Sequence, residues 1–304
     1  MIVSLTGGLG NQLFQMYAGL YFEKNQVRLT SKFGNPRQTC ELTDLFHFNL
    51  PHRVRVIPSE DKGKFPHKVG GLALRSGLLP NSINKFFLPK FIVNSTMDLY
   101  FSATLKERVS TFSSTEVGLS SVSPSGKKIV FGYFQTYKYF KALSMEDKKI
   151  SLKIKTQDFS HLKDRAEIER PVVVHIRLGD YVAEKHFGIL SLDYYSKALR
   201  KLGAEISTSP IWIFSDDAIN AINFLPSELR SRFFVVPKEN LSPAETLELM
   251  RYGSAYVIAN SSFSWWAATL SYTDKARVVA PEKWFAGMQD PRDLLPSDWM
   301  TESR

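Results

Sequence analysis

Cysteine is nearly absent from this sequence of 304 residues, which contains Cys40 and no other. One cysteine excludes an intramolecular disulfide and any zinc site made of several thiolates, and such low usage is typical of a reducing compartment such as the cytoplasm. No run of about 18 apolar residues is present, so we expect no membrane-spanning helix. The first eight residues have neither the basic region nor the long apolar region of a secretion signal. The sequence therefore predicts a soluble protein, or one that lies at a membrane surface.

Glycine and proline are not enriched, with 17 and 15 residues, which excludes collagen-like and low-complexity chains. Hydrophobic residues make up 43% of the chain and charged residues 23%, and this apolar content excludes global disorder. The length is long for one compact domain and comfortable for two domains of about 150 residues each.

Acidic residues are too few to balance the basic ones, because 39 Lys and Arg against 30 Asp and Glu give a net charge of +9. Residues 51–100 carry only three acids, and their eight basic residues are Arg53, Arg55, Lys62, Lys64, Lys68, Arg75, Lys85 and Lys90. Such a surplus favours phosphate-bearing ligands, nucleic acid or an anionic membrane, although a solvated basic face produces it too. We expect no nucleic-acid partner, since the sequence has no known module and no basic face interleaved with aromatics.

Strands and helices alternate regularly after residue 170. The expected strands are 172–177, 211–214, 233–236, 255–259 and 277–280, and helices are expected near 191–202, 217–224, 242–251 and 262–271. This alternation predicts a parallel, doubly wound α/β sheet. At the start of one helix, Ser242, Pro243 and Glu245 match a capping box with proline at the first helical position.

The first half of the chain begins with the same kind of unit and is less regular afterwards. Its expected elements are a strand at 2–5, a helix at 11–24, a Ser-rich loop at 110–126, a strand at 129–134 and a helix at 137–145. The polar stretch 153–170 is the best candidate for a linker or a domain boundary. We therefore expect two domains, 1–160 and 161–304.

A glycine-rich turn, Gly7-Gly8-Leu9-Gly10-Asn11-Gln12-Leu13, joins the first strand to its helix. Leu13 replaces the third glycine of a dinucleotide fingerprint, and the second strand has no acid after it to hold a ribose. The turn is not a P-loop either, because no Gly-Lys-Ser/Thr follows. Backbone N–H groups at such a helix start can bind an anion or a sugar, with Asn11 as the expected N-cap. A tight turn without a ligand is the alternative.

The segment His175-Ile176-Arg177-Leu178-Gly179-Asp180-Tyr181 leaves the sheet at the carboxyl end of a strand, where open α/β sheets bind ligands. Strand alternation places His175 and Arg177 on the same side. The planar fork of Arg177 suits a phosphate, Gly179 permits a sharp turn, and Asp180 could orient the arginine or accept a proton. The alternative is a structural Arg–Asp pair beside a satisfied histidine.

Two further strand ends carry polar side chains. In Ser215-Asp216-Asp217 the paired carboxylates suggest a divalent metal or recognition of guanine N–H groups, or else helix capping. A metal needs further ligands, which the sequence does not nominate. The stretch Asn260-Ser261-Ser262-Phe263-Ser264 opens a helix with hydroxyls and backbone N–H groups, which is anion-binding chemistry, and the following Trp265 and Trp266 are expected in the core.

Together, these four segments resemble the signature segments of the bacterial α-1,2-fucosyltransferases, glycosyltransferase family 11. The resemblance covers most of the chain in the expected order. Leu178 departs from it, because many relatives have a second arginine there. The implied fold is of the GT-B type, with two Rossmann-like α/β domains facing a central cleft. Residues 161–304 would bind GDP-fucose, and residues 1–160 would lie on the acceptor side.

The resemblance implies inverting transfer of L-fucose from GDP-β-L-fucose to O2 of a terminal galactose, with no cofactor and no metal. The implied donor-binding residues are Gly8, Gly10, Asn11, His175, Arg177, Ser215, Asp216, Asp217, Asn260, Ser261, Ser262, Phe263 and Ser264. Arg177 would neutralise the leaving GDP, assisted by the helix start at 261–264. Asp180 or His186 could act as the base, and Asn11 would contact the sugar or a phosphate.

The resemblance also implies partners. The acceptor would be a galactose-terminated oligosaccharide, such as a lipid-linked repeat unit of O-antigen or another surface polysaccharide. The enzyme would then lie in the cytoplasm, on the inner face of the membrane, with the basic segment 51–100 against anionic lipid. The alternative is a related enzyme that uses another nucleotide sugar or makes another linkage.

Overall fold

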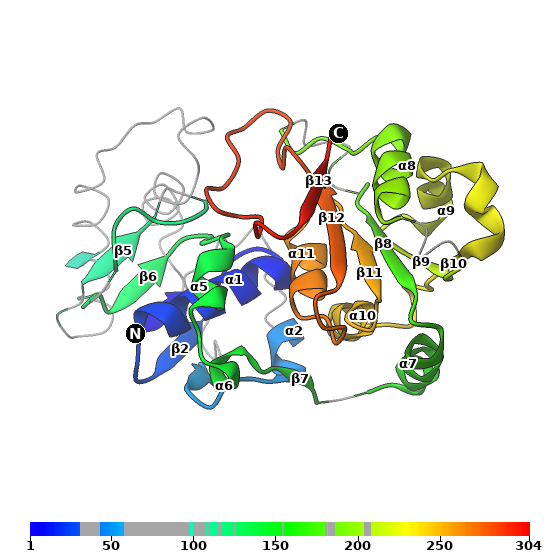
Figure 1. The fold of residues 1–304 in the computed structure, drawn as a ribbon. Coiled ribbons are helices and arrows are strands. Elements are labelled where there is room, and N and C mark those ends of the chain that lie inside the picture. The colour runs from blue at the N-terminus through cyan, green and yellow to red at the C-terminus, as the bar shows by residue number, and fades with distance from the viewer. Residues whose placement is uncertain are drawn as a thin grey trace. The chain divides into compact units, whose positions relative to one another are not determined.

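The chain forms two compact units in a computed structural model (Figure 1). The structure describes residues 1–30, 43–57, 98–99, 102, 108, 110–114, 117–124, 126–153, 155–179, 181, 186–203 and 208–304. The first unit comprises Met1–Ile150 with Pro291–Leu294, and the second comprises Ser151–Asp290 with Leu295–Arg304. Each unit contains its own parallel sheet, which confirms the expected fold of two Rossmann-like domains.

The sheet of the first unit has the strand order β4-β2-β1-β6-β5, and every neighbouring pair is parallel. Its strands are β1 (Ile2–Ser4), β2 (Val27–Thr30), β4 (Val54–Val56), β5 (Thr111–Ser113) and β6 (Ile129–Phe131). The helices and the remaining short strand are α1 (Leu9–Phe22), α2 (Thr43–Phe46), β3 (Phe48–Asn49), α5 (Tyr137–Lys141) and α6 (Met145–Lys148). Because β1 lies between β2 and β6, the turns after β1 and β6 leave the same edge of this sheet.

Helix α1 packs closely against β1 and β2, the strands that precede and follow it in the sequence. Its apolar residues recur at helical spacing, and the buried ones include Leu9, Leu13, Phe14, Tyr17 and Leu20. A side chain on Gly19 would collide with Val3 of β1 and Val27 of β2, at 2.7 and 3.0 Å from its Cβ. Glycine at this position therefore lets the helix lie directly on the sheet.

An ion pair ties the end of α1 to α6. Arg53 contacts Asp147 through two hydrogen bonds of 2.9 and 2.6 Å, and it also donates to the carbonyls of Leu20 and Glu23. Both side chains of the pair are largely buried. The hydrogen bond from Arg53 is the main reason that the pKa of Asp147 lies below its ordinary value of 3.8.

Arg53→Met is expected to lower the free energy of unfolding by about 3 kcal/mol at neutral pH, because the Asp147 carboxylate would stay buried without its cation. The pKa of Asp147 is lower in the folded protein, so this contribution is complete above pH 3.8 and is lost as pH falls through the folded value. Urea unfolding across this pH range measures the effect, with Arg55→Met as the control at an exposed arginine two residues away. A loss that does not shrink in acid would contradict the assignment.

The sheet of the second unit has the order β10-β9-β8-β11-β12-β13 and is parallel throughout. Its strands are β8 (Val172–Ile176), β9 (Ile211–Ser215), β10 (Phe233–Val235), β11 (Ala255–Val257), β12 (Arg277–Pro281) and β13 (Met300–Glu302). The other elements are β7 (Ser151–Leu152), α7 (Gln157–Glu169), α8 (Leu192–Lys201), α9 (Ala218–Ala221), two 3-10 turns at Ile222–Phe224 and Ser227–Arg232, α10 (Pro243–Met250) and α11 (Ser262–Thr269). The doubly wound alternation expected after residue 170 is therefore present.

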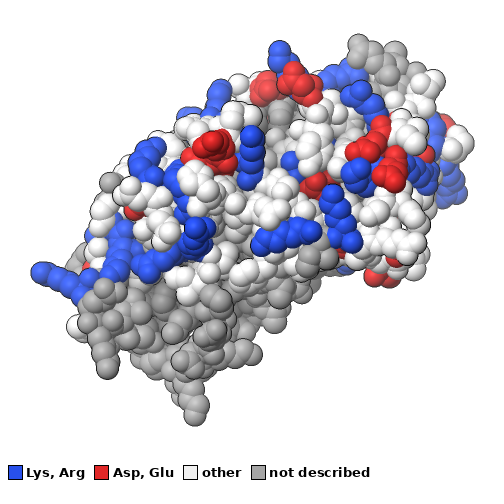
Figure 2. Space-filling view, turned by 90° about the horizontal axis from the view of Figure 1, so that it is seen from below, with Lys and Arg blue, Asp and Glu red and all other residues white. Residues whose placement is uncertain are grey.

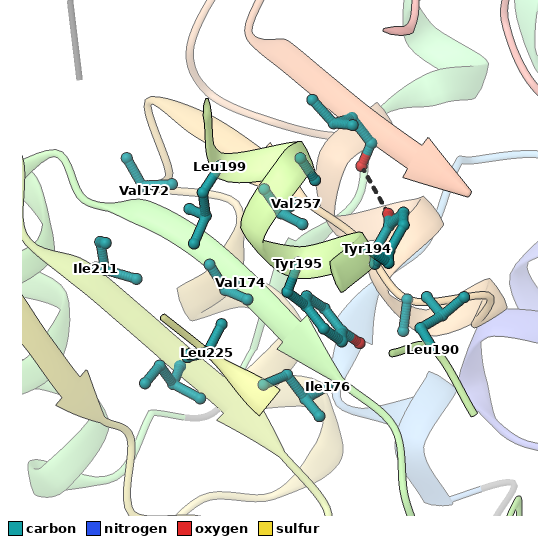
Figure 3. Packing of buried hydrophobic residues seen from close by; sticks show 14 of the residues in the cluster. Val172, Val174, Ile176, Leu190, Tyr194, Tyr195, Leu199, Ile211, Leu225 and Val257 are labelled. Carbon is teal, nitrogen blue, oxygen red and sulfur yellow. Dashed lines mark hydrogen bonds between the residues drawn. The ribbon is translucent and has the colours of Figure 1, made fainter. Parts of the chain in front are cut away.

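The core between β8 and α8 supports the carboxyl ends of the strands (Figure 3). Val172, Val174 and Ile176 alternate onto the face that packs against the buried tyrosines of α8. Tyr194 donates from its hydroxyl to the carbonyls of Ile258 and Val279, at 2.7 and 3.4 Å, and Tyr195 donates to that of His175 at 3.2 Å. Burial raises the pKa of both hydroxyls, so they remain neutral donors that fix these strand ends.

The stretch expected to be a linker, 153–170, contains helix α7 instead. Thr156 caps the helix by accepting from the N–H of Phe159, at 3.2 Å, and Phe159 and Ala166 are buried. A helix that buries only a narrow apolar stripe needs few hydrophobic residues, so the composition of this stretch resembles that of a linker. The helix contacts α10, and the second unit therefore starts at Ser151, ten residues before the expected boundary.

Candidate active site

Three adjacent strands of the second unit, β9, β8 and β11, bring the predicted polar segments to one edge of the sheet. Arg177 follows β8, Asp216 follows β9, and Asn260 lies three residues beyond the end of β11. The edge is continuous with the start of α11, since the rings of His175 and Phe263 lie 6.1 Å apart between centroids. The structure therefore gathers these segments on the carboxyl side of the sheet.

Arg177 is held by Asp216. The Nη1 atom of Arg177 lies 3.1 Å from Oδ2 of Asp216, and the other carboxylate oxygen accepts the N–H of Leu178 at 2.9 Å. A Cβ on Gly179 would collide with the same carboxylate, so this position requires glycine. The Arg177 side chain is one-third exposed while that of Asp216 is only 13% exposed, which leaves a fixed cation open at the strand end. The pair matches the structural alternative in joining Arg177 to an aspartate, which is Asp216, but its arginine is not buried.

His175 lies behind the arginine and is almost completely buried. Burial, followed by the charge of Arg177, lowers the pKa of His175 to about 3, so the ring is neutral at physiological pH. Its Nδ1 atom has no hydrogen-bond partner among the described residues. His175 therefore offers a neutral, preorganised polar atom next to the cation.

The two adjacent carboxylates have different environments. Asp217 is the N-cap of α9, where it accepts from the backbone and side chain of Asn220 at 3.1 and 2.7 Å. These hydrogen bonds lower the pKa of Asp217. Ser215 exchanges hydrogen bonds with the backbone of Asp217 at 3.1 and 3.2 Å, which closes the turn. Asp217 therefore caps a helix, which is one of the alternatives that the sequence left open for these two carboxylates.

The start of α11 presents Ser262 and Phe263 at partly exposed positions, and Ser261 is its N-cap, accepting from the N–H of Phe263 at 3.4 Å. The first N–H groups of a helix have no partner within the helix, and the helix dipole favours an anion there. Ser264 is buried and donates to the carbonyl of Ser261 at 3.2 Å, which is a structural contact. Trp265 and Trp266 are fully buried, as expected of core residues.

The loop that contains His186 is fastened to the same edge of the sheet. Asn260 donates to the carbonyls of Phe187 and Gly188 at 3.0 and 3.2 Å, and Arg304 donates to that of Phe187 at 2.9 Å. His186 itself is exposed, and its carbonyl accepts the N–H groups of residues 286 and 287 at 3.0 and 3.1 Å. Asn260 thus holds the loop, and His186 is presented at the surface.

Tyr181 joins the Arg177 site to this loop. Its hydroxyl donates to the carbonyl of Asn260 at 3.1 Å, its ring stacks on Phe187, and the guanidinium of Arg177 lies 5.5 Å from the ring centroid. Sequence reasoning assigned no role to Tyr181 or to Arg304. Asp180, the other predicted base, lies outside the described residues, as do the basic residues between 62 and 90.

Leu178 is buried in the core of the second unit rather than directed at the site. The position where many relatives carry a second arginine therefore adds apolar packing in this protein. Arg177 supplies the cation at this strand end.

In the first unit, helix α1 begins at Leu9 with Gly8 as its N-cap. Asn11 is therefore inside the first turn and is not the N-cap that we expected, because Gly7 in a left-handed conformation (φ +75°) turns the chain earlier. Gly8 is exposed, with open space where a Cβ would lie, and Gly10 is buried in the same turn. The structure thus places Gly8, Gly10 and Asn11 together at a helix start.

These observations define a fold class: two Rossmann-like α/β units, each with its own parallel sheet, are the fold of a GT-B-type glycosyltransferase. The model of glycosyl transferase family 11 matches residues 1–301. The chain therefore belongs to glycosyl transferase family 11 and is a glycosyltransferase.

Two relatives from Escherichia coli span the chain. The O-antigen biosynthesis glycosyltransferase WbnK is 29% identical, covering 99% of each chain. An alpha-1,2-colitosyltransferase is 27% identical and covers 99% of this chain and 98% of its own. Among solved structures, the fucosyltransferase NodZ from Bradyrhizobium is similar over 92% of this chain and 94% of its own, with 13% identity and a TM-score of 0.47. Within the described part of the chain, we find no helix with the length and apolar content to span a bilayer.

Proposed function

We propose that the protein transfers L-fucose from GDP-β-L-fucose to O2 of a terminal galactose in an oligosaccharide, with inversion, in the synthesis of O-antigen or another surface polysaccharide. Family membership supports glycosyl transfer, the name of WbnK supports a role in O-antigen synthesis, and the name of the alpha-1,2-colitosyltransferase supports the 1,2-linkage. The observation that carries the proposal is the Arg177 guanidinium, fixed by Asp216 and exposed at the sheet edge.

In the proposed reaction, O2 of galactose attacks C1 of fucose from the face opposite the nucleotide. The C1–O bond breaks, and its electron pair leaves with the β-phosphate of GDP. Arg177 and the start of α11 would stabilise this charge, which is the role that a metal ion performs in other enzymes. We propose that no metal is needed. A neutral His175 and the partly exposed Ser262 and Phe263 would contact the rest of the nucleotide.

The proton of the attacking hydroxyl requires an acceptor, or a transition state loose enough to release it late. His186 is exposed on a loop fastened by Asn260, so a base role for it is compatible with the geometry. Asp180 is the alternative proposed from the sequence.

Competition between donors tests the choice of sugar. Colitose is fucose without its 3-hydroxyl, so the alpha-1,2-colitosyltransferase relative makes GDP-colitose the second candidate donor. With equal GDP-fucose and GDP-colitose and one galactoside acceptor, we expect the fucosylated product to predominate in the mass spectrum. Predominance of the colitosylated product would contradict the proposed donor.

We further propose that the protein binds peripherally to the cytoplasmic face of the membrane, where a lipid-linked acceptor would lie. The net charge of +9 supports this, and Figure 2 shows Lys and Arg side chains at many places on the face in view, with smaller groups of Asp and Glu among them. We expect the protein to sediment with anionic vesicles more than with neutral ones, and salt should weaken this binding. Equal sedimentation with both would contradict the membrane proposal and leave the transfer reaction unaffected.

A further inference from the structure

A buried glutamine that the sequence did not nominate is hydrogen-bonded to Asn11. Gln135 follows β6, and its Nε2 donates to Oδ1 of Asn11 at 2.7 Å, across 124 residues of sequence. Only 8% of Gln135 is exposed, and its Oε1 atom is buried without a hydrogen-bond partner in the described part of the chain. A group that remains partly unsatisfied in the interior calls for an explanation.

The backbone that delivers Gln135 is unusual. Phe134, the residue before it, has φ +54°, a conformation that a bulky side chain rarely adopts. Its ring is buried against Tyr139 and Phe22, and a Cβ on Gly132 would fall 2.6 Å from that ring. The N–H of Gln135 also donates to a carbonyl at residue 117, at 2.6 Å. Tertiary packing thus imposes a strained conformation that fixes one side chain, a feature that concentrates at functional sites.

The consequence is a fixed polarity for the Asn11 amide. Because Gln135 occupies the oxygen of Asn11, the amide presents its Nδ2 donor on the side of Gly7, where a Cβ would lie 2.5 Å from that atom. Gly7 and Gly8 add no side chains there, and the first backbone N–H groups of α1 are donors too. This helix start therefore offers hydrogen-bond donors, which suit the oxygen atoms of a sugar or phosphate.

We propose that Gln135 is a positioning residue, which sets Asn11 as a hydrogen-bond donor to an oxygen of the sugar-phosphate substrate. This inference rests on the proposed function. Gln135 acts through Asn11 and holds the orientation of its amide group.

The variant Gln135→Glu distinguishes a positioning role of Gln135 from a purely structural one. The introduced carboxylate keeps the shape of the side chain but can only accept, so the Asn11 amide turns over. Its Nδ2 then donates to the carboxylate, and its Oδ1 faces the substrate. The hydrogen bond survives this exchange, but the introduced carboxylate is buried without a cation, so the thermal midpoint should fall and kcat/KM is measured well below it. The donor becomes an acceptor, however, and kcat/KM should fall about 100-fold at pH 8.

Two comparisons sharpen the test. Lowering the pH protonates the carboxylate introduced by Gln135→Glu, which can then donate to Asn11 again, so part of the lost kcat/KM should return relative to wild type at the same pH. Gln135→Met removes the hydrogen bond without inverting the amide and should lose only about tenfold. Asn11→Asp keeps the bond from Gln135 but presents an oxygen to the substrate, and should match the Gln135→Glu loss.

The inference is overturned if Gln135→Glu retains kcat/KM within about threefold of wild type, or if Gln135→Met loses as much as Gln135→Glu. The ratio of kcat/KM between each variant and the wild type is measured with the nucleotide sugar that the wild type uses. A wild type that prefers another donor contradicts the proposed function alone, whereas unchanged ratios contradict the role of Gln135 alone.

Discussion

Arg177→Ala is expected to reduce kcat/KM for transfer at least 100-fold, because it removes a central cation that faces the leaving phosphate. The guanidinium is fixed by Asp216 and is exposed at the strand end. Its side chain extends past the end of β8, so the buried core between β8 and α8 should be unaffected. The thermal midpoint should therefore change little while activity and GDP affinity fall, which steady-state kinetics and calorimetry measure.

Two controls accompany this variant. Arg177→Lys keeps the charge without the planar fork and should recover only part of the loss. Arg200→Ala removes an exposed arginine on α8 and should leave transfer unchanged. Retention of more than about a tenth of wild-type activity by Arg177→Ala would contradict its role in charge stabilisation.

Asp216→Asn is expected to reduce kcat/KM about 100-fold, although the acid itself contacts other protein groups. One carboxylate oxygen binds Arg177 and the other binds the N–H of Leu178. An asparagine has one oxygen for these two donors, and its amide N–H₂ would face either Arg177 or that backbone N–H. The arginine would therefore lose its fixed position.

The adjacent acid supplies a matched control. Asp217 caps α9, and asparagine is as good an N-cap as aspartate. Asp217→Asn should therefore leave the stability of the protein unchanged and keep kcat/KM within about twofold of wild type. Kinetics and GDP titration of the two variants compare neighbouring carboxylates with the same chemical change. A larger loss of GDP binding in Asp217→Asn would contradict this ranking, and would support the sequence-based prediction that Asp217 recognises guanine.

Local signals were sufficient to predict the alternating strands and helices between residues 172 and 280. The capping box at Ser242, with Pro243 and Glu245, is present as expected, and the run of valines in β8 is a buried parallel strand. Both depend on residues close together in sequence. It could also be predicted that the polar segments share one edge of the sheet, because the carboxyl ends of parallel strands lie on the same side.

Contacts between distant residues could not be predicted in this way. Gln135 meets Asn11 across 124 residues, and Arg304 meets Phe187 across 117. No periodicity or spacing indicates such pairs. The start of α1 was misplaced because the positive φ of Gly7, which lets the chain turn before Asn11, is a backbone property that tertiary packing selects.

The most direct test of the account is transfer from GDP-fucose to a panel of β-galactosides in the presence of EDTA, with the product linkage determined by NMR. We expect an α-1,2-fucosylated product that forms without a metal ion, and the panel would rank the acceptors. A product with another linkage, or one that EDTA abolishes, would contradict the corresponding part of the proposal. No turnover with any acceptor, together with no binding of GDP by calorimetry, would contradict the central claim that Arg177 and its neighbours form a GDP-sugar site.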